Sequence, residues 1–375
     1  IEKLILENAN TSPDLHYTMD ADELPLCSDF RMPSYGAALY HESRFTLGHW
    51  RITAGIRADY ECTRLRYHSK AGMDCSLSVN GGAPAPIRID IDEANEIAHS
   101  YTEILPKFSV MYCFDEVRNL YVSVARGYKA GGFNTQMFSD ILQEKIKWQM
   151  ASGIPYDEPD LMSYEPEYSW NYEVGFKSSW FNNRVNFNTS LFYIDLSDQQ
   201  VTQVLPTANT VIRNAGKSRS MGFEVEASAL ITEGLLFEGS FGYTDAKYRR
   251  YSDKVSGMDY AGNRTPLAPE YTYNLALQYS LPLLESFDFF HKEDSLTWIT
   301  RAELQGVGKF YWNDANTLKQ DPYELVNLRT GLETDNYSIT FWAKNVFDKK
   351  YNCVAFAFSG SSALAQVGAP RSFGV

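Results

Sequence analysis

Carboxylate pairs are the first residues of this sequence that could do chemistry. Glu224 and Glu226 are separated by one residue in a segment of alternating apolar and polar residues. In an extended strand their side chains would share one face, about 7 Å apart. Two carboxylates at such a distance could serve glycoside hydrolysis. Many other segments carry charge on the same face, however, and no Ser–His–Asp order, nucleophile elbow or HExxH motif occurs, so we predict that the chain is not an enzyme.

Two further segments resemble ligand-binding motifs in composition. Residues 127–132 read Gly-Tyr-Lys-Ala-Gly-Gly, but a phosphate-binding loop needs a helix after the strand, and none is predicted here. Glycines also suit a strand that bends where it leaves a membrane. Asp90, Asp92, Glu93 and Glu96 carry the oxygen ligands that calcium prefers. A solvated acidic loop is the simpler interpretation of these four residues.

The histidines and cysteines predict no metal site and no cofactor. The six histidines lack mutual ligand spacing. The five cysteines are an odd number and contain no C-x-x-C motif, so they predict neither a zinc site nor a full disulfide framework. Cys62 and Cys75 fall in one segment, and their spacing leaves a disulfide between them open.

The elements that position these residues show a strict alternation of two faces. Between residues 50 and 61, one face reads Trp, Ile, Ala, Ile, Ala, Tyr, and the other reads Arg, Thr, Gly, Arg, Asp, Glu. A face with four charges cannot pack into a dry core, so it must meet water while the opposite face meets an apolar phase. About thirteen segments show this pattern, many near the about 9–11 residues of a tilted membrane strand: 35–46, 49–67, 101–114, 118–129, 165–180, 184–204, 209–231, 235–248, 268–281, 295–312, 322–334, 337–347 and 370–375.

The connections between these strands alternate in length. Short turns are predicted at Gly48-His49, Asp115-Glu116, Asn182-Asn183, Glu233-Gly234 and Asp335-Asn336, and long loops at 68–99, 130–163, 249–266, 313–321 and 348–369. Only 282–294 is a longer connection where a short one is due. Short turns at one end and long extracellular loops at the other are typical of an antiparallel transmembrane β-barrel. A soluble propeller or large sandwich is the alternative, but the polar faces are too charged for either.

Composition agrees with a barrel. Aromatic residues make up 14% of the chain, with 25 tyrosines and 22 phenylalanines, as expected for girdles at two membrane interfaces. No run approaches about 18 consecutive apolar residues, so the sequence predicts no transmembrane helix. The net charge of −13 argues against a nucleic-acid partner, because phosphates require basic patches.

Blocks of residues in one order and spacing carry a resemblance to a known family. They are Leu105–Phe108, Leu120–Asn134, Tyr164–Glu167, Trp170–Lys177, Asn214–Gly216 with Gly222–Glu226, Trp342–Asp348 with Lys350-Tyr351, and Pro370–Val375. Over this stretch the chain resembles the C-terminal barrel of TonB-dependent receptors, and several blocks are similar to the siderophore-receptor branch. The resemblance implies a barrel of about 22 strands with a plugged lumen, in the outer membrane of a Gram-negative bacterium.

Relative to that family, the expectation is a partial barrel over residues 1–375. About thirteen of the strands are present, whereas the N-terminal plug domain, the TonB-box segment and the end of the last strand are not. Ile1 is no initiator, so we expect the chain to begin inside a longer protein. A complete barrel of twelve or fourteen strands is the alternative.

The resemblance implies active import of a scarce ligand, most simply a ferric siderophore, with cobalamin, haem and oligosaccharides as other ligands. The implied partners are the TonB complex acting through the plug, outer-membrane lipid and lipopolysaccharide, and a surface lipoprotein. A passive porin or an adhesin-like barrel without energy coupling is the other hypothesis. Candidate ligand-binding residues are aromatic and amide side chains in the loops, since rigid aromatic rings suit ligand capture: Tyr128, Phe133, Asn134, Trp148, Tyr156 and Trp312.

Overall fold

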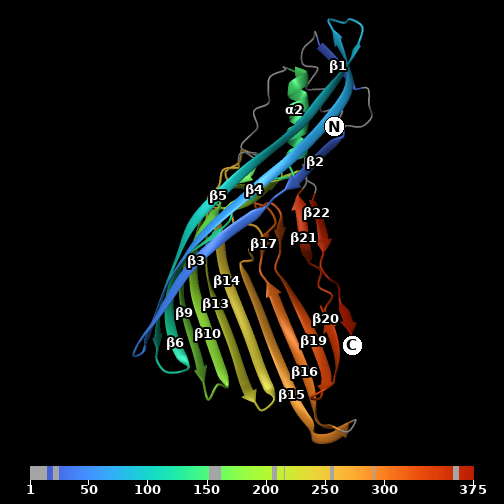
Figure 1. The fold of residues 1–375 in the computed structure, drawn as a ribbon. Helices are drawn as coiled ribbons and strands as arrows, with labels where there is room; N and C mark the ends of the chain where they lie inside the picture. The colour runs from blue at the N-terminus through green and yellow to red at the C-terminus, as the bar shows by residue number, and fades with distance from the viewer. Residues whose placement is uncertain are drawn as a thin grey trace.

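One antiparallel sheet carries most of the chain (Figure 1). The computed structural model describes residues 15–19, 25–151, 162–204, 209–214, 216–253, 257–289, 292–357 and 363–375. The strands of this sheet are β1 (Leu15–Met19), β2 (Leu26–Arg31), β3 (Ser34–Leu47), β4 (Trp50–Val79), β5 (Ala85–Cys113), β6 (Arg118–Lys129), β9 (Glu167–Trp180), β10 (Val185–Ser197), β13 (Lys217–Thr232), β14 (Leu235–Arg250), β15 (Tyr271–Phe289), β16 (Lys292–Val307), β19 (Tyr323–Glu333), β20 (Ser338–Lys344) and β23 (Ser372–Gly374).

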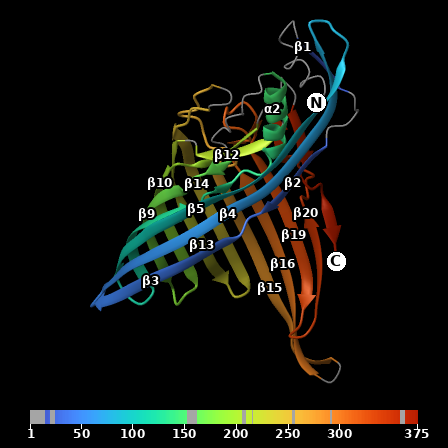
Figure 2. The same ribbon diagram turned by 45° about the horizontal axis from the view of Figure 1, so that its top comes forward.

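From β3 onward, each strand of this sheet pairs with the strand before and after it in the sheet's chain order, so this part is an up-and-down meander. It runs from β4 through β5, β6, β9, β10, β13, β14, β15, β16, β19 and β20 to β23. Strands β1, β2 and β3 all pair with the long β4, one after another along its length. Leaving out β1 and β2, which the sequence did not predict, thirteen strands match the predicted thirteen in order and approximate position. Figure 2 shows the sheet curved into a trough with a concave inner face.

The two faces of the sheet differ as the alternation predicts. Large apolar side chains stand exposed on the convex face, for example Leu191 at 59% and Phe341 at 54%. The concave face carries polar and charged groups, among them an ion pair between Arg301 and Glu303 at 3.1 Å. A continuous surface of exposed apolar side chains is stable against lipid and unfavourable in water. The convex face is therefore the one that faces the membrane.

The short turns lie at one end of the sheet and the long connections at the other, as predicted. At the turn between β13 and β14, Gly234 has φ +87°, and an added Cβ would lie 2.2 Å from the carbonyl oxygen of Ser280, so only glycine fits. The connection 282–294 contains no long loop in its described residues. Instead β15 and β16 extend as a paired ribbon, with Phe289 opposite Lys292.

The long connections hold more regular structure than the sequence predicted. The 68–99 loop prediction was wrong, because β4 and β5 stay paired up to Leu77 opposite Ala85. The 130–163 connection contains α2 (Phe138–Ala151), β7 (Gly132–Phe133) and β8 (Ser163–Tyr164). Small hairpins β11 (Gln200–Val204) with β12 (Thr210–Asn214), β17 (Phe310–Tyr311) with β18 (Lys319–Gln320), and β21 (Asn352–Ala357) with β22 (Ala363–Val367) occupy three other connections.

The alternation reverses its sense where β4 leaves the membrane. Below this point Ile56 and Tyr60 are exposed on the convex face, whereas above it the convex positions are Arg64 and Arg66. The concave positions become apolar in turn, and Leu65 is fully buried. A lipid-facing position tolerates no charge, so this reversal marks the level at which the strand passes from lipid into water. We call the part of the hairpin beyond it, residues 64–99, the β4–β5 extension.

Helix α2 covers the apolar face of the β4–β5 extension. Leu142 and Ile146 pack with Met73, Cys75 and Ile91, and all five are buried. Phe138 stands edge-on to Tyr67 at a ring distance of 4.7 Å and to Phe30 at 4.8 Å. An extracellular layer with a hydrophobic core of its own therefore stands above the membrane part of the sheet.

All five cysteines are free thiols. Cys62 and Cys75 both lie on β4, and thirteen residues of extended strand hold them roughly 40 Å apart. A disulfide between them, which the sequence left open, is excluded by this distance. Among the described residues, no helix has the length and apolar character needed to cross a membrane.

Candidate functional site

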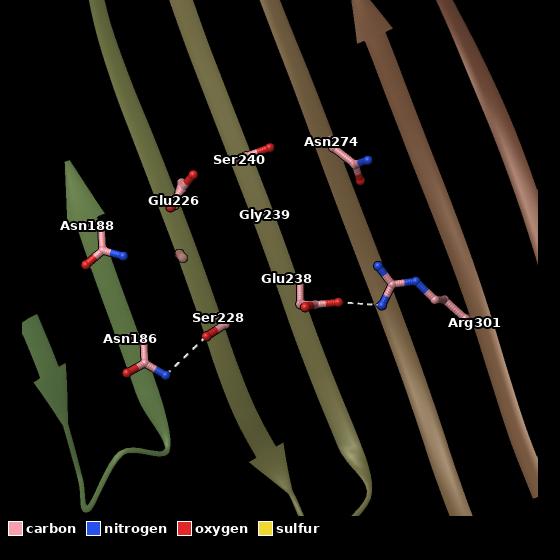
Figure 3. A pocket seen from close by; sticks show the side chains of 10 residues that line it. Asn186, Asn188, Glu226, Ser228, Glu238, Gly239, Ser240, Asn274 and Arg301 are labelled. Carbon is pink, nitrogen blue, oxygen red and sulfur yellow. Dashed lines mark hydrogen bonds and ion pairs between the residues drawn. The ribbon is translucent and has the colours of Figure 1, made fainter. Parts of the chain in front are cut away.

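The concave face carries polar side chains that converge from neighbouring strands. A depression of about 320 Å³ lies on β10, β13, β14, β15 and β16, and on the first three of these strands its residues are close to the short turns (Figure 3). Because alternate residues of each strand point inward, five neighbouring strands contribute to it together. The side chains that line it are Asn186, Asn188, Glu226, Ser228, Glu238, Ser240, Asn274 and Arg301.

Charge is unevenly distributed in this depression. Arg301 on β16 forms ion pairs with Glu238 on β14 and with Glu303 on its own strand. Glu226 on β13 has no cation within ion-pair distance among the described residues, and the same holds for its neighbour Glu224. On one side of the depression the carboxylate of Glu226 contacts no described cation, and on the other side the guanidinium of Arg301 is neutralised by its two ion pairs. Amide and hydroxyl groups lie between them. The depression can bind polar ligands or a cationic protein surface by hydrogen bonds and charge.

A second depression of about 410 Å³ continues the polar face toward the end of the chain. Arg301 and Glu303 line its near side, and Arg329, Lys344 and Trp342 line its far side. Lys344 lies over the Trp342 ring at 5.4 Å, a cation–π distance. The inner face therefore changes from acidic over β13 to basic over β19 and β20.

The extracellular connections form a layer held together by side-chain hydrogen bonds. Asn209 donates to the hydroxyl of Ser139 at 3.1 Å and to the carboxylate of Asp140 at 2.8 Å, which joins the β11–β12 hairpin to α2. Gln203 in the same hairpin donates to Asp253 at 2.9 Å in the next connection. The side chain of Asn316 donates to the carbonyl oxygen of Arg264 at 2.9 Å and joins a third connection. Such bridges hold neighbouring loops in one arrangement and limit their independent motion.

A buried cluster of tyrosine and aspartate lies at the centre of this layer. The hydroxyl of Tyr248 donates to Asp314 at 2.7 Å, and that of Tyr251 donates to the same carboxylate at 3.5 Å. Tyr251 also accepts a hydrogen bond from Gln203 at 3.1 Å. Burial raises the pKa of Asp314 above its usual value, and the nearby carboxylate of Asp253 adds to the rise, against the effect of the two tyrosine hydroxyls.

This pKa shift predicts that the loop layer loses stability as pH rises. Asp314 binds its proton more tightly when the loop layer is folded than when the layer is open. Protonated Asp314 therefore stabilises the folded layer fully below the ordinary aspartate pKa, and this stabilisation is lost as pH rises through the raised pKa of Asp314. Hydrogen exchange at the amides of Tyr260 and Gly262, whose partners are Tyr251 and Tyr248, should show decreasing protection over that range after correction for intrinsic rates. Asp314→Asn keeps a hydrogen-bond acceptor but has no titratable charge, so in this variant the amide protection should decrease less steeply with pH. An unchanged slope in this variant would contradict the assignment.

The structure brings two of the sequence-predicted residues together. The ring of Phe133 lies 5.4 Å from that of His99 and packs against the core beneath α2. The amide of neighbouring Asn134 is buried and pairs with the backbone of Ile212, donating to its carbonyl oxygen and accepting from its N–H, both at 2.8 Å. Asn134 acts as an extra strand partner that joins two connections, which is a structural role that the sequence did not suggest.

Replacing Asn134 should open this junction. In Asn134→Ala the backbone groups of Ile212 lose both side-chain partners in a partly buried place, which costs about 1–3 kcal/mol. We expect faster hydrogen exchange at the Ile212 amide, with the global unfolding transition in lipid little changed. Asn186→Ala, which removes an amide exposed on the inner face, is the matched control and should leave Ile212 protected. Equal exchange at Ile212 in both variants would refute this role for Asn134.

The other predicted ligand residues lie apart from one another. Tyr128 stands on β6 opposite Tyr168 of β9, near the end of the paired region. Trp312 follows β17 and meets Phe310 edge-on at 4.8 Å. The indole nitrogen of Trp312 is buried and has no hydrogen-bond partner among the residues that the structure describes. Trp148 belongs to α2, whose side chains beyond Ile146 lie outside the described residues, and Tyr156 lies outside them altogether.

The acidic segment that could have held calcium is neutralised by cations of the β4–β5 extension. Asp92 contacts His68 at 2.6 Å and Lys70 at 3.2 Å. Glu96 contacts both Arg64 and Arg66, and Asp90 contacts Arg88. Cross-strand pairs to Asp92 and Glu96, and a pair within β5 to Asp90, account for these carboxylates on an exposed face. No group of three potential metal-binding side chains occurs within the described parts of the chain.

Comparison with known proteins agrees with this architecture. The β-barrel model of the TonB-dependent-receptor-like family matches residues 9–346. The pesticin receptor of Yersinia pestis is 23% identical over 378 residues, covering 99% of this chain and 47% of the relative. The ferrioxamine receptor of Yersinia enterocolitica is 26% identical over 258 residues, covering 67% of this chain and 30% of the relative. This chain thus spans about half or less of the length of these relatives.

Solved structures share the fold. The ferric yersiniabactin uptake receptor of Yersinia pestis aligns with a TM-score of 0.58 at 18% identity, over 97% of this chain and 58% of that one. The siderophore receptor PiuA of Acinetobacter baumannii aligns with a TM-score of 0.59 at 15% identity, over 92% and 55%. The meander, its lipid-facing convex surface and the family model lead to one identification. The chain belongs to the TonB-dependent-receptor-like β-barrel family, which places it in the outer membrane of a Gram-negative bacterium.

Proposed function

We propose that this protein is an outer-membrane receptor that binds a ferric siderophore and imports it with energy from the TonB complex. The observation that carries the proposal is the family match over residues 9–346, together with relatives named as pesticin and ferrioxamine receptors. The protein acts by binding and transport and catalyses no reaction. The TonB complex reaches it through a plug domain.

Two structural features support a gated receptor over a passive porin or an adhesin-like barrel. The extracellular connections form a bonded layer through Asn209, Gln203 and Asn316, whereas a passive pore needs an unobstructed mouth. The inner face carries unpaired carboxylate at Glu226 beside amides and hydroxyls. A polar inner face of this kind can hold a plug by many reversible hydrogen bonds.

The ligand enters through the loop layer in this proposal. Trp312 is a described aromatic residue of these connections, and its indole N–H has no hydrogen-bond partner among the described residues. Tyr128, Phe133, Trp148 and Tyr156 are the other aromatic candidates. Outer-membrane lipid and a surface lipoprotein are further proposed partners.

Calorimetry on the full-length protein in detergent tests this proposal. The panel contains ferric ferrioxamine, ferric yersiniabactin, haem, cobalamin and neutral oligosaccharides. We expect tight binding of one ferric siderophore, with weaker binding of its iron-free form. Binding of none of these compounds, with a steady ion-conducting pore in planar bilayers, would favour the passive barrel and overturn the proposal.

A further inference from the structure

Strand β5 has a long edge that no other strand of the described chain covers. It pairs with β4 over residues 85–112, but with β6 only over residues 107–113. Figure 1 shows β4 and β5 continuing together past the ends of the neighbouring strands. The side of residues 87–98 that faces away from β4 is therefore open, and we call it the β5 edge. Strands added at either end of the sheet would not reach it, because β5 lies between β4 and β6.

Every second residue of β5 directs its backbone N–H and C=O toward this edge. In an antiparallel ladder both groups of one residue point to the same side, and the side alternates along the strand. The N–H of Cys113 donates to the carbonyl oxygen of His49 on the β4 side at 2.8 Å, whereas the carbonyl oxygen of Ile104 accepts from Arg126 of β6 at 2.9 Å. The register with β4 has no shift, so the even-numbered residues face away from β4 along all of β5. In the β5 edge these residues are Arg88, Asp90, Asp92, Ala94, Glu96 and Ala98.

The edge-facing backbone groups are almost without partners in the part of the chain that the structure describes. The N–H of Glu96 donates to the side-chain oxygen of its neighbour Asn95 at 2.8 Å, and no other hydrogen bond between described residues reaches these groups. Natural sheets usually protect such an edge with proline, lysine, a bulge or a covering segment. Residues 87–105 contain no proline, lysine or glycine, and their pairing with β4 has no bulge. The β5 edge is therefore open to the addition of a further strand.

The side chains beside the edge define what an added strand would meet. On the convex face, Asp90 and Asp92 lie next to the edge and are 61% and 62% exposed. Lys70, which contacts Asp92, lies one row behind them on β4. On the concave face, Ile89 and Ile91 belong to the buried core beneath α2. An added strand would therefore meet carboxylates on one face and apolar side chains on the other.

We propose that the β5 edge binds an extended segment of a partner protein in which basic residues alternate with apolar residues. The added strand runs antiparallel to β5, the more stable arrangement, and its basic residues lie opposite Asp90, Asp92 and Glu96. Opposite charges on directly facing residues stabilise a sheet. The apolar residues of the segment lie opposite Ile89 and Ile91 and extend the core beneath α2. Backbone hydrogen bonds supply the affinity, and the alternation of side chains supplies the specificity.

A second copy of this chain fits the β5 edge less well than a basic partner does. Two such edges paired antiparallel would bring the row of Asp90, Asp92 and Glu96 against the same row of the other copy. Like charges directly opposite one another destabilise a sheet. The proposal does not involve the imported ligand, so siderophore binding and strand addition can fail independently.

Fluorescence anisotropy of a labelled peptide with the full-length protein in detergent tests this proposal. The probe is a short peptide of alternating lysine and valine, and the control has the same residues in two blocks. We expect the alternating peptide to bind about 10-fold more tightly, because only its strand carries lysine on one face and valine on the other. N-methyl groups on its lysines should abolish binding, since these residues direct their N–H groups toward β5. N-methyl groups on its valines, whose N–H groups point away, should leave binding unchanged.

Variants of the receptor test the same edge. Ala94→Pro removes an edge-facing N–H, which an edge strand tolerates, and should weaken binding about 10-fold. Asp90→Asn should weaken binding about 3-fold, because it removes one cross-strand charge pair. Asp74→Asn is its matched control: it removes the other carboxylate that contacts Arg88, but from β4, and should bind like the wild type. Hydrogen exchange at Met73 shows whether the β4–β5 extension stays folded in each variant.

Three results would overturn the proposal. The first is equal affinity of the two N-methylated peptides, or no binding of the alternating peptide, and neither requires a variant. The second is equal affinity of the alternating and block peptides, because general electrostatics would then account for binding. The third is a dimer of the full-length protein in sedimentation that Ala94→Pro dissociates, which would make a second copy of the chain the occupant of the edge.

Discussion

Leu191→Arg should prevent stable insertion of the barrel or weaken it severely. Leu191 lies in the middle of β10, is 59% exposed and faces outward with Phe223 and Val174 beside it. An arginine on the lipid face near the bilayer midplane costs about 2–4 kcal/mol. Urea titration of the full-length protein refolded into phosphatidylcholine vesicles should therefore show a lower midpoint with an unchanged slope.

Its neighbour on the same strand provides the control. Ser190 points to the concave face and pairs with Glu224, so Ser190→Arg places the same side chain in water beside a carboxylate that no described cation contacts. We expect Ser190→Arg to unfold within about 0.5 kcal/mol of the wild type, as surface substitutions usually do. If both variants lose similar stability, or if Ser190→Arg loses more, the convex face is not the lipid face.

Ile146→Ala should detach helix α2 from the β4–β5 extension. Ile146 is fully buried against a core that includes Met73 and Cys75. Truncation of a buried isoleucine to alanine costs about 2–5 kcal/mol, which is comparable to all that docking one short helix provides. Protease cleavage within α2 and hydrogen exchange at Met73 should accelerate strongly, while unfolding of the membrane strands stays the same.

The same helix offers a matched variant for this experiment. Gln143 is only partly buried, and Gln143→Ala keeps helix propensity while it removes no core contact. It should leave both readouts at wild-type values. Rapid cleavage in Gln143→Ala, or unchanged cleavage in Ile146→Ala, would contradict the packing of α2 as the anchor of the extracellular layer.

The strands could be predicted from the sequence because their two faces meet different phases. One face of the strand carries apolar Trp50 and Ile56, whereas the other carries charged Arg51 and Arg57. Neither a strand in a soluble core nor a helix would show this contrast between its faces. Residues 68–99 of the β4–β5 extension were not predicted as strands, although they alternate equally well. The apolar residues of the extension, such as Leu65, move to the opposite face above the membrane, so the charged face appears where a lipid-facing strand should continue.

The loop layer could not be predicted because its contacts join residues far apart in the chain. Gln203, Tyr251 and Asp314 belong to three separate connections, and nothing in their local sequence distinguishes them from other polar loop residues. Asn134 was predicted as a ligand-binding candidate, and its pairing with Ile212 could not be predicted because it depends on the meander bringing the two connections together. Local patterns therefore gave the barrel and its lipid face, and only the register of neighbouring strands gave the site.

Active import is the central proposal, and energy-dependent uptake of iron tests it most directly. Cells that lack their own siderophore receptors would express the full-length protein, and uptake of radioactive iron on the siderophore selected by calorimetry would be followed with and without a proton gradient. Saturable accumulation that stops when the gradient is collapsed, or when the TonB protein is deleted, is the predicted result. Uptake that rises linearly with concentration and continues at the same rate without the gradient would contradict active import and leave a passive barrel.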